Sequence, residues 1–319
     1  MILPCRSALP FLWLTLAPIL WGGNFVAGHA LGATLDGVTM NLLRWTFALA
    51  VLTPILLPAT YRHWSAIRAE ASRFALLGLL GVAAFNTILY EGLRLTDVSL
   101  AAIVFAVSPL MIGALSAILN KEPPTPPLIL GMVVSFGAMF VAQASAFEDG
   151  MDPKGALLIF AAALIWSLYS LLLRRRRSDV PAGPAFFAQI VAGTLFLLPV
   201  AAIRGAPVPS MSPIEIGALA YLGIGAAALA FWLWQKGIAA VGAAHAGPFM
   251  NLVPMSSLVL GWMLLDMPVS RLEIVAFSIV LLGIALANAP PTWTAQLLRP
   301  RVAMCLALAL IPSEAFANV

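Results

Sequence analysis

The chain has 319 residues, of which 62% are hydrophobic and 9% are charged, and its formal net charge is +4. A soluble domain carries about 25% charged residues, so the composition excludes an ordinary soluble enzyme and indicates a polytopic membrane protein. The positive charge does not indicate nucleic-acid binding, because the basic residues stand between apolar runs, where they set topology. Cys5 and Cys305 lie near opposite ends of the chain, and we expect no structural disulfide.

Ten apolar stretches follow one another along the chain, and a helix of about 20 residues crosses the hydrocarbon core of a bilayer. They predict an all-α protein with ten transmembrane helices and no inserted soluble domain. The predicted spans are residues 10–32, 36–58, 72–92, 95–119, 127–146, 154–174, 182–203, 213–235, 240–265 and 270–290. The later apolar stretch 302–311 is too short to cross a bilayer.

The second half of the chain repeats the first at an offset of 145 residues. Trp21 recurs as Trp166, and the same offset joins Pro54 to Pro199, Gly78 to Gly223, Gly92 to Gly237 and Pro109 to Pro254. Five spans per half are an odd number, so the second half enters the membrane upside down, as in transporters with inverted repeats. We predict a first repeat at 1–147, an inverted second repeat at 148–292 and a cytoplasmic or interfacial tail at 293–319.

The basic residues predict the orientation in the membrane. Four lie on one side of the predicted spans, and Arg44 lies inside a span. Twelve lie on the other side, which places both termini in the cytoplasm: Arg6, Arg62, Arg68, Arg73, Lys121, Arg174, Arg175, Arg176, Arg177, Lys236, Arg299 and Arg301. The four consecutive arginines are read as a topological anchor and not as a lipid or nucleic-acid patch. Because Trp21 belongs to the repeat, the first span is read as retained and not as a signal peptide.

Two tryptophans are expected near the middle of the membrane. Trp21 and Asn24 are three residues apart and share a helix face, and their repeat partners are Trp166 and Tyr169. Lipid-facing tryptophans usually sit at the interfaces, so these four residues are candidates for the lining of a substrate cavity. The alternative is packing between helices, with the polar groups bonded inside the protein.

Arg44 is the one charge embedded in a predicted span, and its repeat partner is Gln189. A charge within the bilayer is functional by default, so we expect Arg44 to pair with a substrate carboxylate or phosphate. The alternative is a structural arginine that caps helix carbonyls or snorkels outward. In the third span, Asn86 and Tyr90 are one turn apart and are expected to face protein or water.

The fourth and ninth spans contain prolines at matching places, Pro109 and Pro254, and the ninth also contains Gly247 and Pro248. A proline inside a helix removes a backbone hydrogen bond and bends the helix. Such paired bends suit hinges for alternating access, although static bends are equally compatible with the pattern. 

Acidic residues are not expected at mid-membrane, and only His245 offers a titratable group near the inner end of the ninth span. Proton-coupled carriers usually use a buried carboxylate or histidine relay, so this pattern favours facilitated movement. Neither a phosphate-binding loop nor a cluster of metal ligands is visible. We therefore expect no cofactor, no metal and no enzymatic activity.

The order of these motifs resembles the drug/metabolite transporter superfamily, EamA-type branch, over about residues 10–290. The resemblance rests on Ile19 to Phe25, Asn41 to Trp45, Leu95 to Ala102 leading to Pro109, and Gly247 to Pro254. It implies a monomeric, multi-pass exporter of the bacterial inner membrane, similar to the YddG-type amino-acid exporters. Its partners would be a small-molecule substrate and the lipid bilayer, without nucleic acid.

The leading functional hypothesis is export of aromatic or other neutral amino acids and related metabolites by alternating access. The expected substrate-binding residues are Trp21, Asn24, Arg44, Asn86, Tyr90, Trp166, Tyr169, Gln189 and Phe249. The alternative is efflux of drugs or cationic toxicants by proton antiport.

Overall fold

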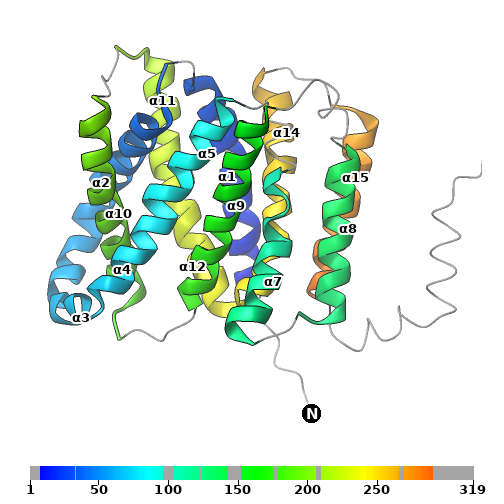
Figure 1. The fold of residues 1–319 in the computed structure, drawn as a ribbon, viewed down its shortest axis with the longest axis horizontal. Helices are drawn as coiled ribbons and strands as arrows, with labels where there is room; N and C mark the ends of the chain where they lie inside the picture. Colours follow the sequence, from blue (N-terminus) through cyan, green and yellow to red (C-terminus); the bar gives the residue numbers. More distant parts are fainter. Residues whose placement is uncertain are drawn as a thin grey trace, which may run out of the picture.

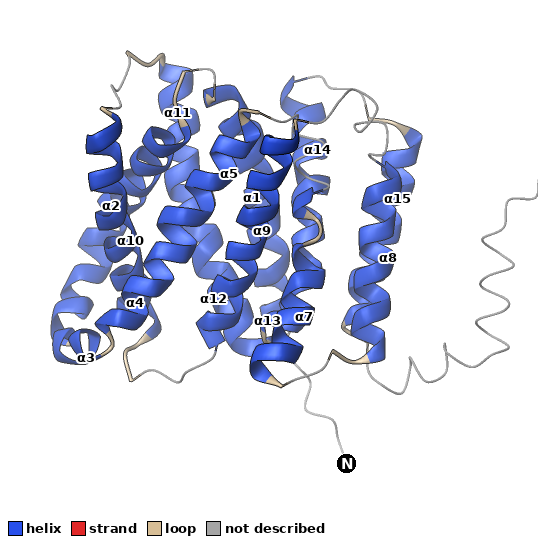
Figure 2. Cartoon of the chain, viewed as in Figure 1, coloured by secondary structure: helices blue, strands red, loops and turns tan. Residues whose placement is uncertain are grey.

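The computed structural model describes residues 8–32, 34–95, 104–121, 124–142, 152–174, 179–205, 210–265 and 269–289. Within these ranges every regular element is helical (Figure 2). The predicted tail at 293–319, Arg175 to Arg177 and most of the motif at 95–102 lie outside the described residues.

The helices follow the ten predicted spans in order (Figure 1). The first half contains α1 (Leu9–Leu31), α2 (Gly37–Arg62), a connecting α3 (Trp64–Ala69), a third span of α4 (Ala71–Gly78), η1 (Leu79–Ala84) and α5 (Phe85–Leu93), then α7 (Ser108–Asn120) and α8 (Pro126–Ala142). The second half contains α9 (Pro153–Arg174), α10 (Ala182–Arg204), an eighth span of α11 (Pro213–Tyr221), η3 (Leu222–Leu229) and α12 (Ala230–Val241), a ninth of α13 (Ala243–Ala246), η4 (Gly247–Asn251) and α14 (Leu252–Leu265), and α15 (Arg271–Ala287). 

Seven helical stretches of the described chain are long and apolar enough to cross a membrane, and α7 and α8 are shorter apolar helices. The protein is therefore a multi-pass membrane protein made of helices.

The contacts between the halves follow the repeat. Helix α2 packs against α10, and α8 packs against α15. Helix α5 packs against α9 just as α12 packs against α1, and α7 against α9 just as α14 packs against α1. The Ser135 hydroxyl donates to the Val280 carbonyl 145 residues away, so this contact lies at the pseudo-two-fold axis. The two halves pack into one bundle, and the second half is inverted relative to the first, as the odd number of spans predicts.

The repeated glycines are sites where helices meet closely. A Cβ on Gly223 would lie 2.8 Å from the Arg44 carbonyl oxygen, and a Cβ on Gly78 would collide with the Gln189 carbonyl. Gly92 faces the Ile159 side chain, and its repeat partner faces the matching leucine of α1. Glycine recurs at these places because the same backbone approach occurs twice.

The third and eighth spans both contain a π-helical stretch, η1 and η3, at matching places. A π-helix bonds its carbonyls to the fifth following residue, and such stretches often lie at functional sites. Side chains of neighbouring helices use the carbonyls of both stretches: Asn41 donates to Val82 and Ala83 in η1, and Trp21 donates to Ala226 in η3. The distortion thus brings backbone acceptors into the protein centre.

The bends predicted at Pro109 and Pro254 fall next to irregular helical turns. The chain turns at Ala106 and Val107, and Pro109 is the second residue of α7. Pro254 is the third residue of α14, after the 3-10 segment η4. A proline in the first turn of a helix removes no hydrogen bond, because those N–H groups have no partner within the helix, and this applies to Pro109. The ninth span stays helical from Ala243 to Leu264 through η4, so Pro254 lies inside that span.

Candidate functional site

The centre of the bundle holds a cluster of aromatic rings from both halves. The Trp21 and Trp166 rings meet edge to face with centroids 5.0 Å apart, and Trp234 lies 5.5 Å from Trp21 and 5.7 Å from Trp166. Phe231 lies 5.6 Å from both Trp21 and Trp166. These rings are buried. The mid-membrane tryptophans predicted from the repeat therefore meet each other where the two halves join.

Arg44 lies beside this cluster and is fully buried. Its Nη1 donates to Asn24 Oδ1 at 2.9 Å, to Asn86 Oδ1 at 2.7 Å and to the Tyr90 hydroxyl at 2.7 Å. Its Nη2 donates to the Ala226 carbonyl at 3.0 Å. The Tyr90 hydroxyl in turn donates to Asn24 Oδ1 at 2.8 Å. Outward snorkelling is excluded, and four residues of the predicted site lie in one network.

Among the described residues, the hydrogen-bond partners of Arg44 are all neutral groups, and no acidic side chain there stabilises its charge. The guanidinium carbon lies 5.5 Å from the Trp45 ring and 5.8 Å from the Phe231 ring, which adds cation–π contacts. A guanidinium keeps its proton in proteins. The site therefore retains a net positive charge in an apolar surrounding, which favours an anionic group nearby.

A small cavity of about 10 Å³ lies between the arginine and the tryptophans. Its lining includes Trp21, Asn24, Arg44, Phe85, Asn86 and Trp166. A cavity needs about 10–15 Å³ to hold a single water molecule. The centre is therefore closed in this conformation, and a solute larger than water needs movement of the helices to enter.

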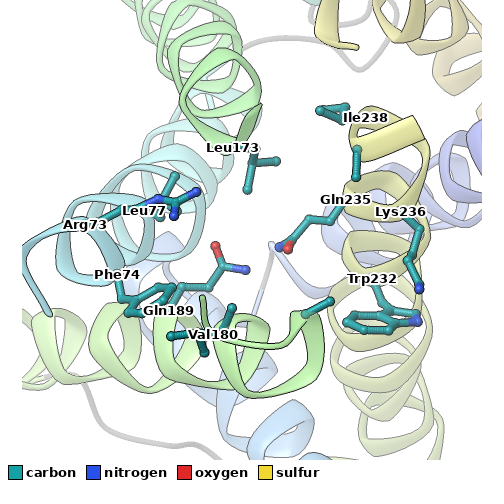
Figure 3. Close-up of a pocket in the computed structure, with 13 residues that line it drawn as sticks. Arg73, Phe74, Leu77, Leu173, Val180, Gln189, Trp232, Gln235, Lys236 and Ile238 are labelled. Carbon is teal, nitrogen blue, oxygen red and sulfur yellow. The ribbon is translucent and has the colours of Figure 1, made fainter. Parts of the chain in front are cut away.

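A second pocket, of about 300 Å³, opens near α3 and α4, at the end of the bundle where the described chain begins (Figures 1 and 3). Its lining includes Arg73, Leu77, Leu173, Gln189, Trp232 and Gln235. Pockets for small molecules start at about 300 Å³, so this space is large enough for an amino acid. Gln189 lines this pocket and not the small central cavity.

Tyr169 lies between the two spaces. Its ring is 5.4 Å from the Trp166 ring and 6.1 Å from that of Phe231, and its hydroxyl accepts a hydrogen bond from Gln235 Nε2 at 3.0 Å. Because Gln235 lines the 300 Å³ pocket, the Tyr169–Gln235 pair lies between that pocket and the central aromatic cluster.

The structure does not bring all the predicted residues together. The Phe249 ring packs against that of Phe11 with centroids 6.2 Å apart, and Phe249 lines neither cavity. Gly247 and Pro248 lie in η4, the 3-10 segment of the ninth span. Glu91, near the end of α5, forms ion pairs with Arg94 and Arg204. 

Three features of the centre were not predicted from the sequence. The Ala226 carbonyl accepts from both Trp21 and Arg44, and Trp234 completes the ring cluster. Asn251 is fully buried at the end of the 3-10 segment η4, and neither of its amide atoms has a partner in the described part of the chain. Only Asn251 carries a sequence signal, namely a polar residue between two prolines of an apolar span.

Two inverted helical halves with a closed polar and aromatic centre are typical of membrane transporters. The chain belongs to the EamA-like transporter family, which residues 8–143 and 153–289 both match. 

Among its relatives, the uncharacterized transporter YyaM of Bacillus subtilis is 28% identical over 76% of this chain and 82% of that protein. The aromatic amino acid exporter YddG of Ancylobacter novellus is 30% identical over 65% of this chain and 79% of that protein. A probable terminal-alkyne amino-acid exporter of Streptantibioticus cattleyicolor is 26% identical over 86% and 92%. A protein with a solved crystal structure shares the fold, with a TM-score of 0.73 and 24% identity over 89% of this chain and 97% of that chain.

Proposed function

We propose that this transporter exports neutral, preferably aromatic, amino acids and related small metabolites across a bacterial inner membrane, with both termini in the cytoplasm. The observation that carries the proposal is that the hydrogen-bond partners of Arg44 among the described residues are all neutral and lie beside a cluster of aromatic rings. A substrate carboxylate would take up hydrogen bonds from Arg44, and an apolar side chain would pack on the rings. Two relatives whose names state amino-acid export support the same substrate class.

In alternating access, the two ends of the bundle would open and close in turn. At the end away from the large pocket, Arg204 binds Glu91 at 2.9 Å and Thr34 binds Glu215 at 2.8 Å, and both contacts join the two halves. At the other end the 300 Å³ pocket penetrates the bundle. With both termini in the cytoplasm, as the basic residues predict, this conformation would be closed outward and accessible from the cytoplasm. The turn before Pro109 and the 3-10 segment that contains Gly247 and Pro248, followed by Pro254, would serve as its hinges.

We propose facilitated movement of the substrate, not strict coupling to protons, by a monomer that needs neither a cofactor nor a metal. Acidic residues of the described chain lie at or near helix ends and away from the centre, among them Asp36, Glu70, Glu91 and Glu273. The alternative is efflux of cationic drugs by proton antiport. A buried arginine without an acidic partner repels a cation, so the central charge favours the amino-acid hypothesis.

The direct test is flux through purified protein in liposomes, with a panel of amino acids and cationic drugs, measured with and without a pH gradient. We expect saturable flux of aromatic amino acids without the gradient. Strict dependence on the gradient would overturn facilitated movement. Flux of drugs without flux of any amino acid would replace the leading function by the alternative.

A further inference from the structure

The repeat places two hydrogen-bonded pairs at equivalent positions in the two halves. In the first half Tyr90 donates to Asn24, and in the second half Gln235 donates to Tyr169. Both pairs are 66 residues apart, and each member of the first pair is 145 residues before its counterpart. The tyrosine stands on the third span in one half and on the sixth span in the other. The same contact between neighbouring helices is thus kept with exchanged residue types.

The third member of each group differs. Arg44 joins the Asn24–Tyr90 pair through hydrogen bonds to both residues. Gln189, its counterpart, is 2% exposed, yet its Oε1 has no hydrogen-bond partner among the described residues. Figure 3 shows the amide ends of Gln189 and Gln235 turned toward each other across the large pocket. A buried acceptor without a donor is rare in folded proteins, and here it faces a space that a ligand can fill.

The rest of the pocket has the other features of a site for an amphipathic molecule. Leu77, Leu173 and Ile238 supply apolar surface, and Arg73 brings a guanidinium whose Nη1 binds Glu70 at 2.8 Å. Figure 3 shows the Arg73 head group on the pocket side of its helix. A guanidinium has five N–H donors in a planar fork, which suits a carboxylate. The pocket therefore offers an acceptor for an ammonium group, a cation for a carboxylate and an apolar wall.

We propose that this pocket is a separate intake site for zwitterionic amino acids, distinct from the central Arg44 site. Gln189 Oε1 and the Gln235 amide bind the α-ammonium group, Arg73 attracts the carboxylate, and the side chain packs on the leucines and Ile238. The Tyr169–Gln235 hydrogen bond separates this site from the aromatic centre, so its opening passes the solute inward. The inference rests on the proposed amino-acid export and adds to it a first binding step.

Chemical labelling tests the intake site independently of transport. Cys5 and Cys305 are changed to serine, and Ala185, which lines the pocket, is changed to cysteine. The rate of labelling by a membrane-impermeant thiol reagent is measured in proteoliposomes with increasing L-phenylalanine. We expect phenylalanine to slow the labelling. Phenethylamine, which keeps the ammonium group, should protect better than phenylpropionate, which lacks it.

The decisive comparison is Gln189→Leu in the same background. Loss of a hydrogen bond to a charged group should raise the half-protective concentration of phenylalanine about tenfold or more. Thermal stability should not fall, because the leucine removes a buried acceptor without a partner. The matched control is Thr194→Val on the same helix, whose hydroxyl bonds only the Ile190 carbonyl in its own helix. It should leave the protection unchanged.

The outcomes separate the two proposals. If wild-type protein transports phenylalanine but phenylalanine gives no protection, or if Gln189→Leu leaves protection unchanged, the intake site is wrong and the proposed function stands. If phenylalanine protects the pocket but is not transported, amino-acid export is wrong and the binding site stands.

Discussion

Arg44 and Gln189 occupy equivalent places in α2 and α10, and the surroundings of their backbones are alike while those of their side chains differ. A repeated glycine presses on the carbonyl of each, Gly223 on Arg44 and Gly78 on Gln189. The two terminal nitrogens of Arg44 make hydrogen bonds to four residues in a closed centre, and its Nε has no partner among the described residues. Gln189 has an unpaired oxygen among the described residues and lines a 300 Å³ pocket. 

The difference separates the frame of the carrier from its chemistry. Two halves with the same helix contacts can exchange conformations with little change in packing energy, which alternating access requires. The polar residues do not follow this symmetry, since one half carries a fixed positive charge and the other a neutral amide at the equivalent position. A solute would therefore meet different chemistry on the two sides of the axis, and this asymmetry is what orients it.

The largest effect is expected from Arg44→Leu. The change removes the buried charge and leaves Asn24, Asn86 and Tyr90 without a shared donor. We expect flux of zwitterionic amino acids to fall by about a hundredfold or more, since hydrogen bonds to a charged group contribute about 1.5–3 kcal/mol each. The measurement is initial flux into liposomes at matched protein content.

A loss of folding must be separated from a loss of function in that variant. Arg44→Lys keeps the positive charge, and thermal unfolding in detergent shows whether each variant is folded. Unchanged amino-acid flux through correctly folded Arg44→Leu protein would contradict a role of this charge in substrate binding.

The symmetry of the frame predicts equal damage at Gly78 and Gly223. A methyl group at either position meets the backbone of the facing helix, so each glycine-to-alanine variant should lose about 1–3 kcal/mol of stability. Gly217→Ala is the control, because nothing lies within 4 Å of its added Cβ. Thermal unfolding of the three variants gives the comparison. Damage at only one of the repeated glycines would show that the two backbone contacts are not equivalent.

The two tyrosines should respond unequally to the loss of their hydroxyl groups. Tyr90→Phe removes a partner of both Arg44 and Asn24, whereas Tyr169→Phe removes only the acceptor for Gln235. We expect about a tenfold to hundredfold loss of flux in Tyr90→Phe and less than tenfold in Tyr169→Phe. Equal losses would mean that the arginine does not distinguish the two sites.

The repeat made much of this arrangement predictable from the sequence, including the order of the spans and the meeting of Trp21 with Trp166. It also paired Arg44 with Gln189, although the placement of Gln189 in a separate pocket depends on how side chains fill the bundle. The Ala226 carbonyl was beyond reach, because the π-helical stretch that presents it has no side-chain signature. The prolines alone did not fix the local structure, because a proline predicts a bend or a helix start equally well, and the neighbouring turns decide between them.

The smallest effect is expected at the outer ion pair. Glu91 joins α5 to Arg204 at the end of α10, but the arginine side chain is 52% exposed, and such pairs contribute about 0–1 kcal/mol. Glu91→Gln should therefore leave thermal stability nearly unchanged.

If this contact holds the outer end closed, the variant should shift the population toward the outward-open state. Labelling of Ala185→Cys in the large pocket should then slow by up to about fivefold. Since the pair is screened by salt, wild-type protein in high salt should show the same change. An unaltered labelling rate in both experiments would mean that the buried contacts around Arg44 close the outer end without help from surface charges.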